Sequence, residues 1–141
     1  MRLIAKNRNA YFNYEILESI NAGVVLKGSE VKSIAKNGMD LSESYVTIRN
    51  GEAFLLNAHI AHYQSGFFDH EPRQTRQLLL NKQEILKFEH EAKVKKLQII
   101  PIKVFFVNSL IKIEIALARP KKIHDKRETI KKRDLDRLNR N

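Results

Sequence analysis

The strongest constraint on the fold is a pair of alternating apolar runs within residues 98–118. In the second run, aliphatic residues are separated by single residues, and this period of two is typical of a half-buried strand. The first run has the same period, and Asn108-Ser109 between the runs suits a tight turn. The pattern predicts an antiparallel hairpin with one apolar face on each strand. Its apolar positions are Ile100, Ile102, Val104 and Phe106 in the first strand and Ile111, Ile113, Ile115 and Leu117 in the second.

Shorter strand patterns precede this hairpin. Residues 44–49 and 52–59 are predicted to form a second hairpin around Asn50-Gly51, a dipeptide that suits a two-residue turn requiring positive φ. Residues 14–20 and 23–26 are predicted to be two short strands separated by a two-residue break. Together these patterns give about six short antiparallel strands, which is typical of a small closed barrel.

Two short helices are predicted between the strands. The first covers residues 29–38, with Ser29 as its N-cap. The second begins at Asn81, where Glu84 completes a capping box. The side chains expected to face the core are Val31, Ile34 and Ala35 in the first helix and Ile85, Phe88 and Ala92 in the second.

These patterns predict an all-β dominated fold: an OB-like β-barrel of residues 1–118 with two or three short helices, followed by a basic tail of residues 119–141. The connection 61–77 is expected to be a polar surface loop. The tail holds ten Lys/Arg and four Asp/Glu, and therefore six of the ten net positive charges of the chain. Its few apolar residues cannot offset the entropy of ordering it, so the tail is expected to order on a polyanion.

Composition narrows the classes of function. A net charge of +10 favours nucleic acid as the partner, although an anionic membrane surface would satisfy the same charge. The absence of cysteine excludes disulfides and thiolate metal sites. No signal peptide is visible, and no stretch approaches the roughly 20 apolar residues of a membrane helix. A cytoplasmic protein is expected.

The histidines raise the possibility of a metal site, which the sequence disfavours. Ligand types suited to zinc occur close together, but no second dense cluster completes a site. No Ser-His-Asp arrangement and no phosphate-binding glycine loop can be assembled either. We therefore expect no catalytic residue, no metal and no cofactor. The residues weighed as ligands are His59, His62, Asp69, His70 and Glu71.

Two groups of residues are candidates for RNA contact. Near the start, Asn7 and Arg8 are followed by Tyr11, Phe12 and Tyr14, and interleaved Arg and aromatic side chains can contact phosphate and stack on unpaired bases. The alternative is that these aromatics anchor a first strand, on which Tyr11 and Phe12 could not both point inward.

Glu30, in the segment GSEVKS, is the second candidate. A carboxylate in the first turn of a helix gains roughly 0.3–1 kcal/mol from the helix dipole, and this structural interpretation is favoured on physical grounds alone. In a functional interpretation, the carboxylate would accept a hydrogen bond from a base amino group.

Several blocks, in order, resemble the SsrA-binding protein family, whose members partner transfer-messenger RNA in bacterial trans-translation. The resemblance covers nearly the whole chain from Asn7 onward, and its motifs are specific. The matching blocks are NAGVVLKGSEVKSI, SESYVTIRNGEAFLLNAHI, TRQLLLNKQEI and LARPKKIHDKRETIKKRD.

The resemblance implies a non-enzymatic RNA-binding translation factor. Its barrel would clamp the tRNA-like domain of transfer-messenger RNA, and the complex, with elongation factor Tu bound indirectly, would enter the vacant decoding site of a stalled ribosome. Its tail would be disordered alone and helical in the empty mRNA channel. Two rivals remain: a general OB-type RNA-binding protein, and a metal-dependent RNA-processing enzyme using His59, His62 and His70.

The resemblance also assigns residues. Asn7 and Glu30 match positions associated with RNA binding, which reverses the structural interpretation of Glu30, and His124 matches a position associated with decoding-centre contact. The predicted RNA-binding residues are Asn7, Arg8, Phe12, Glu30, Lys32, Arg73 and Arg76. The predicted ribosome-contacting tail residues are Lys121, Lys122, His124, Asp125, Lys126, Arg127, Lys131, Lys132 and Arg133.

The chain departs from the family pattern at four positions. Phe12 stands where the family commonly has His, so it can stack but cannot hydrogen-bond. Gln74 and Gln77 replace two basic residues, and Arg73 is expected to compensate for one of them. Pro120 replaces a Gly and should stiffen the exit of the tail.

Overall fold

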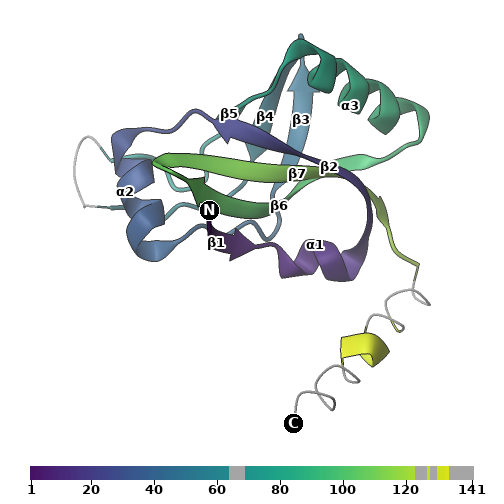
Figure 1. The fold of residues 1–141 in the computed structure, drawn as a ribbon, viewed down its shortest axis with the longest axis horizontal. Helices are drawn as coiled ribbons and strands as arrows, with labels where there is room; N and C mark the ends of the chain where they lie inside the picture. The colour runs from purple at the N-terminus through teal and green to yellow at the C-terminus, as the bar shows by residue number, and fades with distance from the viewer. Residues whose placement is uncertain (64–68, 123–126, 128–129, 134–141) are drawn as a thin grey trace.

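The computed structural model describes residues 1–63, 69–122, 127 and 130–133. Its strands form one seven-stranded sheet in the order β1-β6-β3-β4-β5-β2-β7, and β6 also pairs with β7. This additional pairing closes six of the strands into a barrel, with β1 continuing along β6 (Figure 1). The predicted strand-dominated barrel is therefore confirmed. The elements are β1 Arg2–Lys6, α1 Arg8–Asn13, β2 Tyr14–Val24, α2 Gly28–Asn37, β3 Tyr45–Arg49, β4 Glu52–Leu56, β5 Arg76–Leu79, α3 Lys82–Val94, β6 Gln98–Val107 and β7 Leu110–Pro120.

The two predicted hairpins are present. β3 and β4 pair antiparallel across Asn50 and Gly51, whose φ angles of 52° and 77° are those of the expected turn. β6 and β7 pair along their length, but a β-bulge between Pro101 and Lys103 changes which face of β6 points inward. The expectation that all four apolar residues of the first run share one face is therefore wrong. Ile100 and Ile102 pack in a small cluster with Ala10, whereas Val104 joins the barrel core.

The N-terminal third differs most from the prediction. Residues 14–24 form the single strand β2, because Ala22 is buried and pairs with Ile113 where a break was expected. Strands β1 and β5 were not predicted. The aromatic residues Tyr11 and Phe12 lie on the short helix α1 rather than on a strand, and both are half-buried.

The helices follow the predicted positions with different details. α3 has the expected capping box, in which the Glu84 N–H donates to Asn81 Oδ1 (2.8 Å) and the Asn81 N–H donates to Glu84 Oε1 (3.1 Å). α2 begins one residue earlier than predicted and its N-cap is Lys27, so the Ser29 cap is wrong. Of the expected inward stripe of α2, only Ile34 is buried, since Val31 and Ala35 are exposed.

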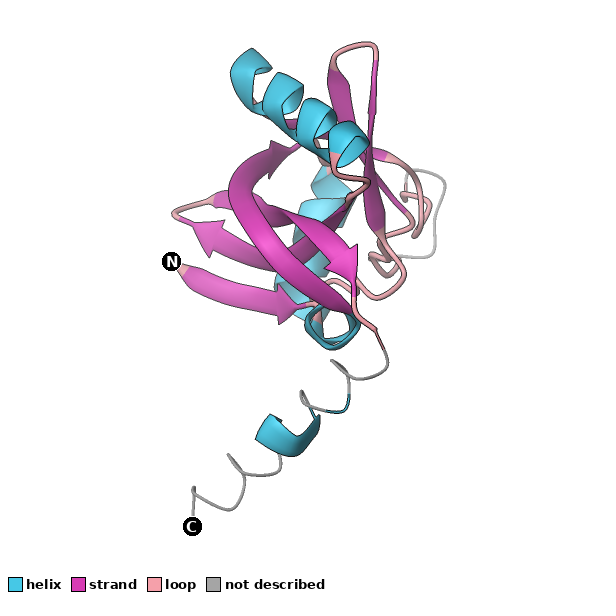
Figure 2. Cartoon of the chain, turned by 90° about the vertical axis from the view of Figure 1, so that its right-hand side faces the viewer, coloured by secondary structure: helices cyan, strands magenta, loops and turns pink. Residues whose placement is uncertain are grey.

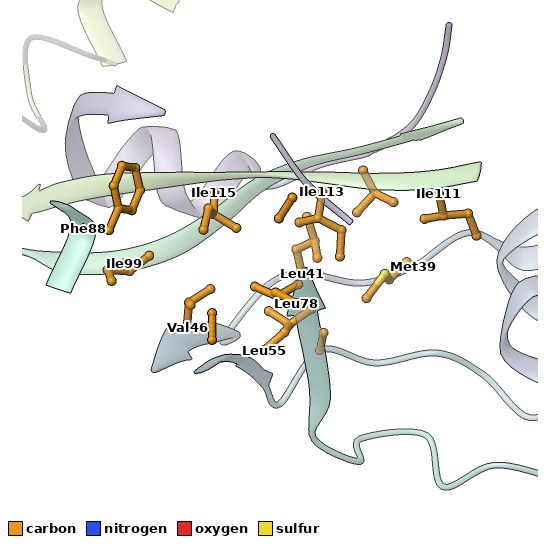
Figure 3. Packing of buried hydrophobic residues seen from close by; sticks show 14 of the residues in the cluster. Met39, Leu41, Val46, Leu55, Leu78, Phe88, Ile99, Ile111, Ile113 and Ile115 are labelled. Atoms are coloured by element: carbon orange, nitrogen blue, oxygen red, sulfur yellow. The ribbon is translucent and has the colours of Figure 1, made fainter. Parts of the chain in front are cut away.

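The main core fills the barrel and is almost entirely aliphatic (Figure 3). Ile111, Ile113 and Ile115 from β7 meet Val46, Leu55 and Leu78 from the opposite strands, and Phe88 of α3 covers one end. Each such side chain contributes roughly 1.5–3 kcal/mol on burial, so this cluster dominates the stability of the barrel. Among the described residues, no helix is long and apolar enough to cross a membrane.

Candidate nucleic-acid interface

The predicted RNA-binding residues fall into two groups at opposite ends of β2. Asn7, Arg8 and Phe12 belong to the start and body of α1, which directly precedes β2. Glu30 and Lys32 lie on α2, which follows it. The eleven residues of β2 lie between the two groups along the chain. They are called here the α1 region and the α2 region.

A buried ion pair lies at the centre of the α2 region. Arg76 Nε donates to Glu30 Oε2 at 2.5 Å, and each side chain is only 1% exposed. The two terminal guanidinium nitrogens donate to the Ala58 carbonyl (2.7 Å) and to the carbonyls of Glu71 (3.2 Å) and Pro72 (3.0 Å). The other carboxylate oxygen of Glu30 accepts from the Lys27 N–H at 2.9 Å. Glu30 therefore ties the start of α2 to β5 and to the 71–72 turn, and in this conformation it has almost no surface to offer a ligand.

A second buried network lies beside the pair. Ser29, Asp69 and His70 meet here, although the sequence suggested no Ser-His-Asp arrangement. However, both Ser29 Oγ (2.8 Å) and Asp69 Oδ1 (3.1 Å) face the same ring nitrogen, Nδ1. The other nitrogen, Nε2, faces the carbonyls of Ile60 and Ala61, which assigns it the hydrogen. A catalytic relay needs the hydroxyl and the carboxylate on opposite nitrogens, so this arrangement is not one.

The connection between β4 and β5 was predicted to be a polar surface loop, but it contains buried residues. His70 is fully buried, and Arg76, expected in the connection, lies inside β5. His62 stacks on His70 with 6.0 Å between ring centroids and pairs with Asp69 at 3.0 Å. Within the described ranges, no three His, Asp or Glu side chains are placed so that they could hold a metal ion.

Exposed cations surround this buried centre. Lys32 Nζ lies 5.8 Å from the centroid of the Tyr63 ring. Arg73 donates to the Asn57 carbonyl at 3.0 Å and faces Asp40. The pKa of the Asp40 carboxyl lies below its usual value, mainly because the Ser42 backbone N–H donates to it (2.9 Å), with a smaller contribution from Arg73. Arg73 and Arg76 join the α2 region through the contacts with Glu30 and the turn before β5, and of its four predicted residues Lys32 and Arg73 are the two that reach solvent.

The α1 region also has a buried residue beneath exposed ones. Asn7 is 6% exposed, and its amide nitrogen donates to the carbonyls of Leu41 (3.2 Å) and Pro101 (2.9 Å). Its Oδ1 accepts from the Ala10 N–H at 3.1 Å and so caps α1. Asn7 therefore fixes the position of α1 on the barrel through hydrogen bonds that occupy both of its donors.

The outer side of α1 is basic and aromatic. Arg8 is exposed, and Lys6 Nζ lies 4.7 Å from the centroid of the Tyr11 ring. The guanidinium of Arg133, in the tail, lies 5.3 Å from the centroid of the Phe12 ring. Cations next to partly exposed rings are the combination that binds phosphate and stacks on unpaired bases.

The tail leaves the barrel beside α1. The Lys121 N–H donates to the Asn13 carbonyl (2.8 Å), and Lys121 Nζ donates to the Tyr11 carbonyl (3.1 Å). Residues 127 and 130–133 have helical backbone and are exposed on the α1 side of the molecule (Figure 2). The predicted tail residues Lys122, Arg127, Lys131, Lys132 and Arg133 are described, whereas His124, Asp125 and Lys126 lie outside the described residues.

Sequence reasoning missed Lys6 and the contact between Ser29 and His70. Lys6 belongs to the unpredicted strand β1, which carries it past Tyr11. The available signal was Asn7, a preferred N-cap residue that predicts a helix start at Arg8. No local signal could link Ser29 to His70, since 41 residues separate them.

Comparisons with known proteins bear on the whole chain. The family model described as SmpB protein matches residues 4–141. The SsrA-binding protein of Trichodesmium erythraeum is 50% identical over 135 residues, covering 94% of this chain and 86% of that protein. The SsrA-binding protein of Mycoplasma mycoides subsp. mycoides is 48% identical over 137 residues, covering 96% and 93%.

A solved structure adds a three-dimensional match. A chain described under "tmRNA-SmpB: a journey to the center of the bacterial ribosome" has a TM-score of 0.73 and 36% sequence identity, and the match covers 92% of this chain and 95% of that one. Family model, relatives and fold agree over nearly the full length and confirm the resemblance seen in the sequence blocks. The chain belongs to the SmpB protein family.

Proposed function

We propose that this protein binds SsrA RNA, the transfer-messenger RNA, and delivers it to stalled ribosomes for trans-translation. The observation that carries the proposal is family membership over residues 4–141, together with relatives named SsrA-binding protein. The described surface is compatible with this role, since exposed cations and partly exposed rings gather on α1. The role itself requires no catalytic group.

In this proposal the two regions of the barrel contact the RNA with different residues. Arg8, Lys32 and Arg73 contact phosphates, and Phe12 stacks on a base. Asn7, Glu30 and Arg76 stabilise the fold around α1 and α2 and do not contact the RNA, because their polar atoms are already used inside the protein. This assigns a structural role to three residues predicted as direct contacts.

The tail is the ribosomal element of the proposal. Its basic residues, with His124 among them, occupy the vacant decoding site and mRNA channel, where rRNA supplies the polyanion on which the tail orders. Elongation factor Tu joins through the RNA. The helical backbone at residues 127 and 130–133 is consistent with an element that completes a helix on binding.

RNA recovered with the protein from its native cell tests the first part. Sequencing should find SsrA RNA enriched, and filter binding to SsrA transcript should survive an equal nucleotide concentration of poly(U). Poly(U) that displaces the transcript would instead support a general single-strand binder, and stoichiometric zinc or manganese in the purified protein would support the metal-dependent rival.

Truncation tests the second part. β7 runs to Pro120 and Lys121 is bonded to α1, so a chain ending at Lys122 keeps the barrel intact. It should bind SsrA RNA within about threefold of the full chain but should not support tagging on stalled ribosomes. The full-length Arg8→Ala variant is the matched control and should weaken RNA binding. A truncated chain that loses RNA affinity would contradict this division of labour.

A further inference from the structure

A pocket of about 290 Å³ with both polar and apolar lining lies between α1, the residues before β3 and the start of β6. Asn9 and Asn13 of α1 line it, together with Glu43, Tyr45 and Gln98. Its volume is at the lower end of the ~300–1,000 Å³ typical of small-molecule sites, so it suits one flat group. It adjoins the basic and aromatic side of α1, yet its described lining contains no cation: the polar groups are amides, hydroxyls and one carboxylate, and Ala10 and Ile100 add apolar surface.

Glu43 is held in an unusual backbone conformation. Its φ of 70° lies in the left-handed region, where a residue with a Cβ is disfavoured and Gly or Asn is common. The Asn57 side chain donates to the Glu43 carbonyl at 3.2 Å, and the Ser44 hydroxyl donates to the Leu41 carbonyl at 2.5 Å. These bonds hold the Glu43 carbonyl and the following residue in place. Backbone strain of this kind is concentrated at ligand-binding positions.

The Glu43 carboxylate has no cationic partner among the described residues, although the chain carries a net charge of +10. A carboxylate repels phosphate, so Glu43 is unsuited to binding the RNA backbone. It can accept hydrogen bonds from base N–H groups. A carboxylate beside a phosphate-binding surface therefore favours contact with the hydrogen-bonding edge of a base.

Guanine fits this lining best among the four bases. Its Watson–Crick edge presents N1–H and N2–H₂ side by side, which match the two oxygens of one carboxylate, and it presents O6 as an acceptor. The Gln98 amide nitrogen can donate to O6, because Gln98 Oε1 already accepts from the Tyr14 hydroxyl at 2.9 Å. Tyr45 is 47% exposed, and its ring offers a stacking face.

We propose that this pocket binds an unpaired guanine of the RNA, with Glu43 and Gln98 reading its Watson–Crick edge. This rests on the proposed function, since it presumes an RNA partner. Adenine, cytosine and uracil each lack the adjacent pair of donors beside an acceptor, so the pocket should discriminate against them.

Side-chain amide resonances of the full-length protein provide a direct test. On titration with GMP, the Asn9, Asn13 and Gln98 side-chain signals should shift and saturate, while AMP, CMP, UMP and inorganic phosphate shift them less. Glu43→Gln keeps the side-chain shape and removes the charge, and it should weaken GMP binding at least about fivefold. Gln98→Ala provides a second variant should Glu43→Gln disturb the backbone. Equal shifts with all four nucleotides, no shift with GMP, or an unchanged affinity in both variants would overturn the proposal.

A parallel filter-binding measurement on SsrA RNA distinguishes failure of the guanine pocket from failure of the proposed function. SsrA RNA binding without a GMP response overturns the guanine pocket and leaves the proposed function standing. A GMP response with no SsrA RNA binding supports the pocket and overturns the function.

Discussion

The α1 and α2 regions contain similar kinds of residue, but the residues have different roles in the two regions. In the α2 region the predicted RNA contacts include a charged pair that is buried, with each guanidinium nitrogen donating to a protein acceptor. In the α1 region a neutral buried amide supports a surface whose cations and rings remain partly exposed. Family motifs thus mark both the residues that shape a surface and those that form it. Substitutions should separate the two classes, because the first class changes stability and the second changes affinity.

The largest effect is expected at the buried pair. Glu30→Ala leaves the Arg76 guanidinium buried without its anion and removes the bond to the Lys27 N–H. Loss of one partner of a buried pair costs about 3–5 kcal/mol, so urea denaturation should show a loss of this size in the free energy of unfolding.

A double variant is the matched control for this prediction. Glu30→Leu with Arg76→Met replaces both charges with apolar groups and should lose less stability than Glu30→Ala alone. RNA affinity of Glu30→Ala, measured where the variant is still folded, should stay near the wild-type value. Wild-type stability combined with a large loss of affinity would instead make Glu30 a direct contact and erase the difference between the regions.

A smaller loss is expected at Asn7. Asn7→Ala removes the cap of α1 and leaves the buried carbonyls of Leu41 and Pro101 without their donor. The two effects together should cost about 2–3 kcal/mol in thermal or urea unfolding. Asn7→Asp keeps an acceptor for the cap but lacks the N–H₂ donors, so it should also be destabilised. An Asn7→Asp variant as stable as wild type would show that the bonds to the two carbonyls contribute little.

The surface of α1 should give the opposite result. Phe12→Ala removes a stacking face, which is worth about 1–3 kcal/mol of RNA affinity, while stability should hardly change because the ring is only half-buried. Phe12→Tyr keeps the ring and should bind RNA like wild type. Arg8→Ala should lower the slope of log affinity against log salt by about one unit. A Phe12→Ala variant that binds normally but melts earlier would place Phe12 with the supporting residues.

The sequence predicted the local features of the molecule well and the nonlocal ones poorly. Alternation and turn chemistry located the β3–β4 and β6–β7 hairpins, and the Asn81 capping box located α3. The bulge in β6 was missed because its cause is the pairing with β7, which lies outside the strand. Burial of Glu30 was missed for the same reason, since its partner Arg76 is 46 residues away.

The smallest effect concerns pH and the surface of the α2 region. The pKa of Asp40 is lowered in the folded state, so ionised Asp40 stabilises the fold above the ordinary aspartate pKa of about 3.9. That contribution disappears as pH falls through the lower folded-state value. Asp40→Asn retains an oxygen for the Ser42 N–H but loses the charge, and because Asp40 is exposed the cost near neutral pH should stay below about 1 kcal/mol. The difference between wild type and variant in urea unfolding should therefore shrink from pH 7 to pH 3. A difference that stays constant over this range would mean that the Asp40 charge does not contribute, and that hydrogen bonding alone holds the segment between α2 and β3.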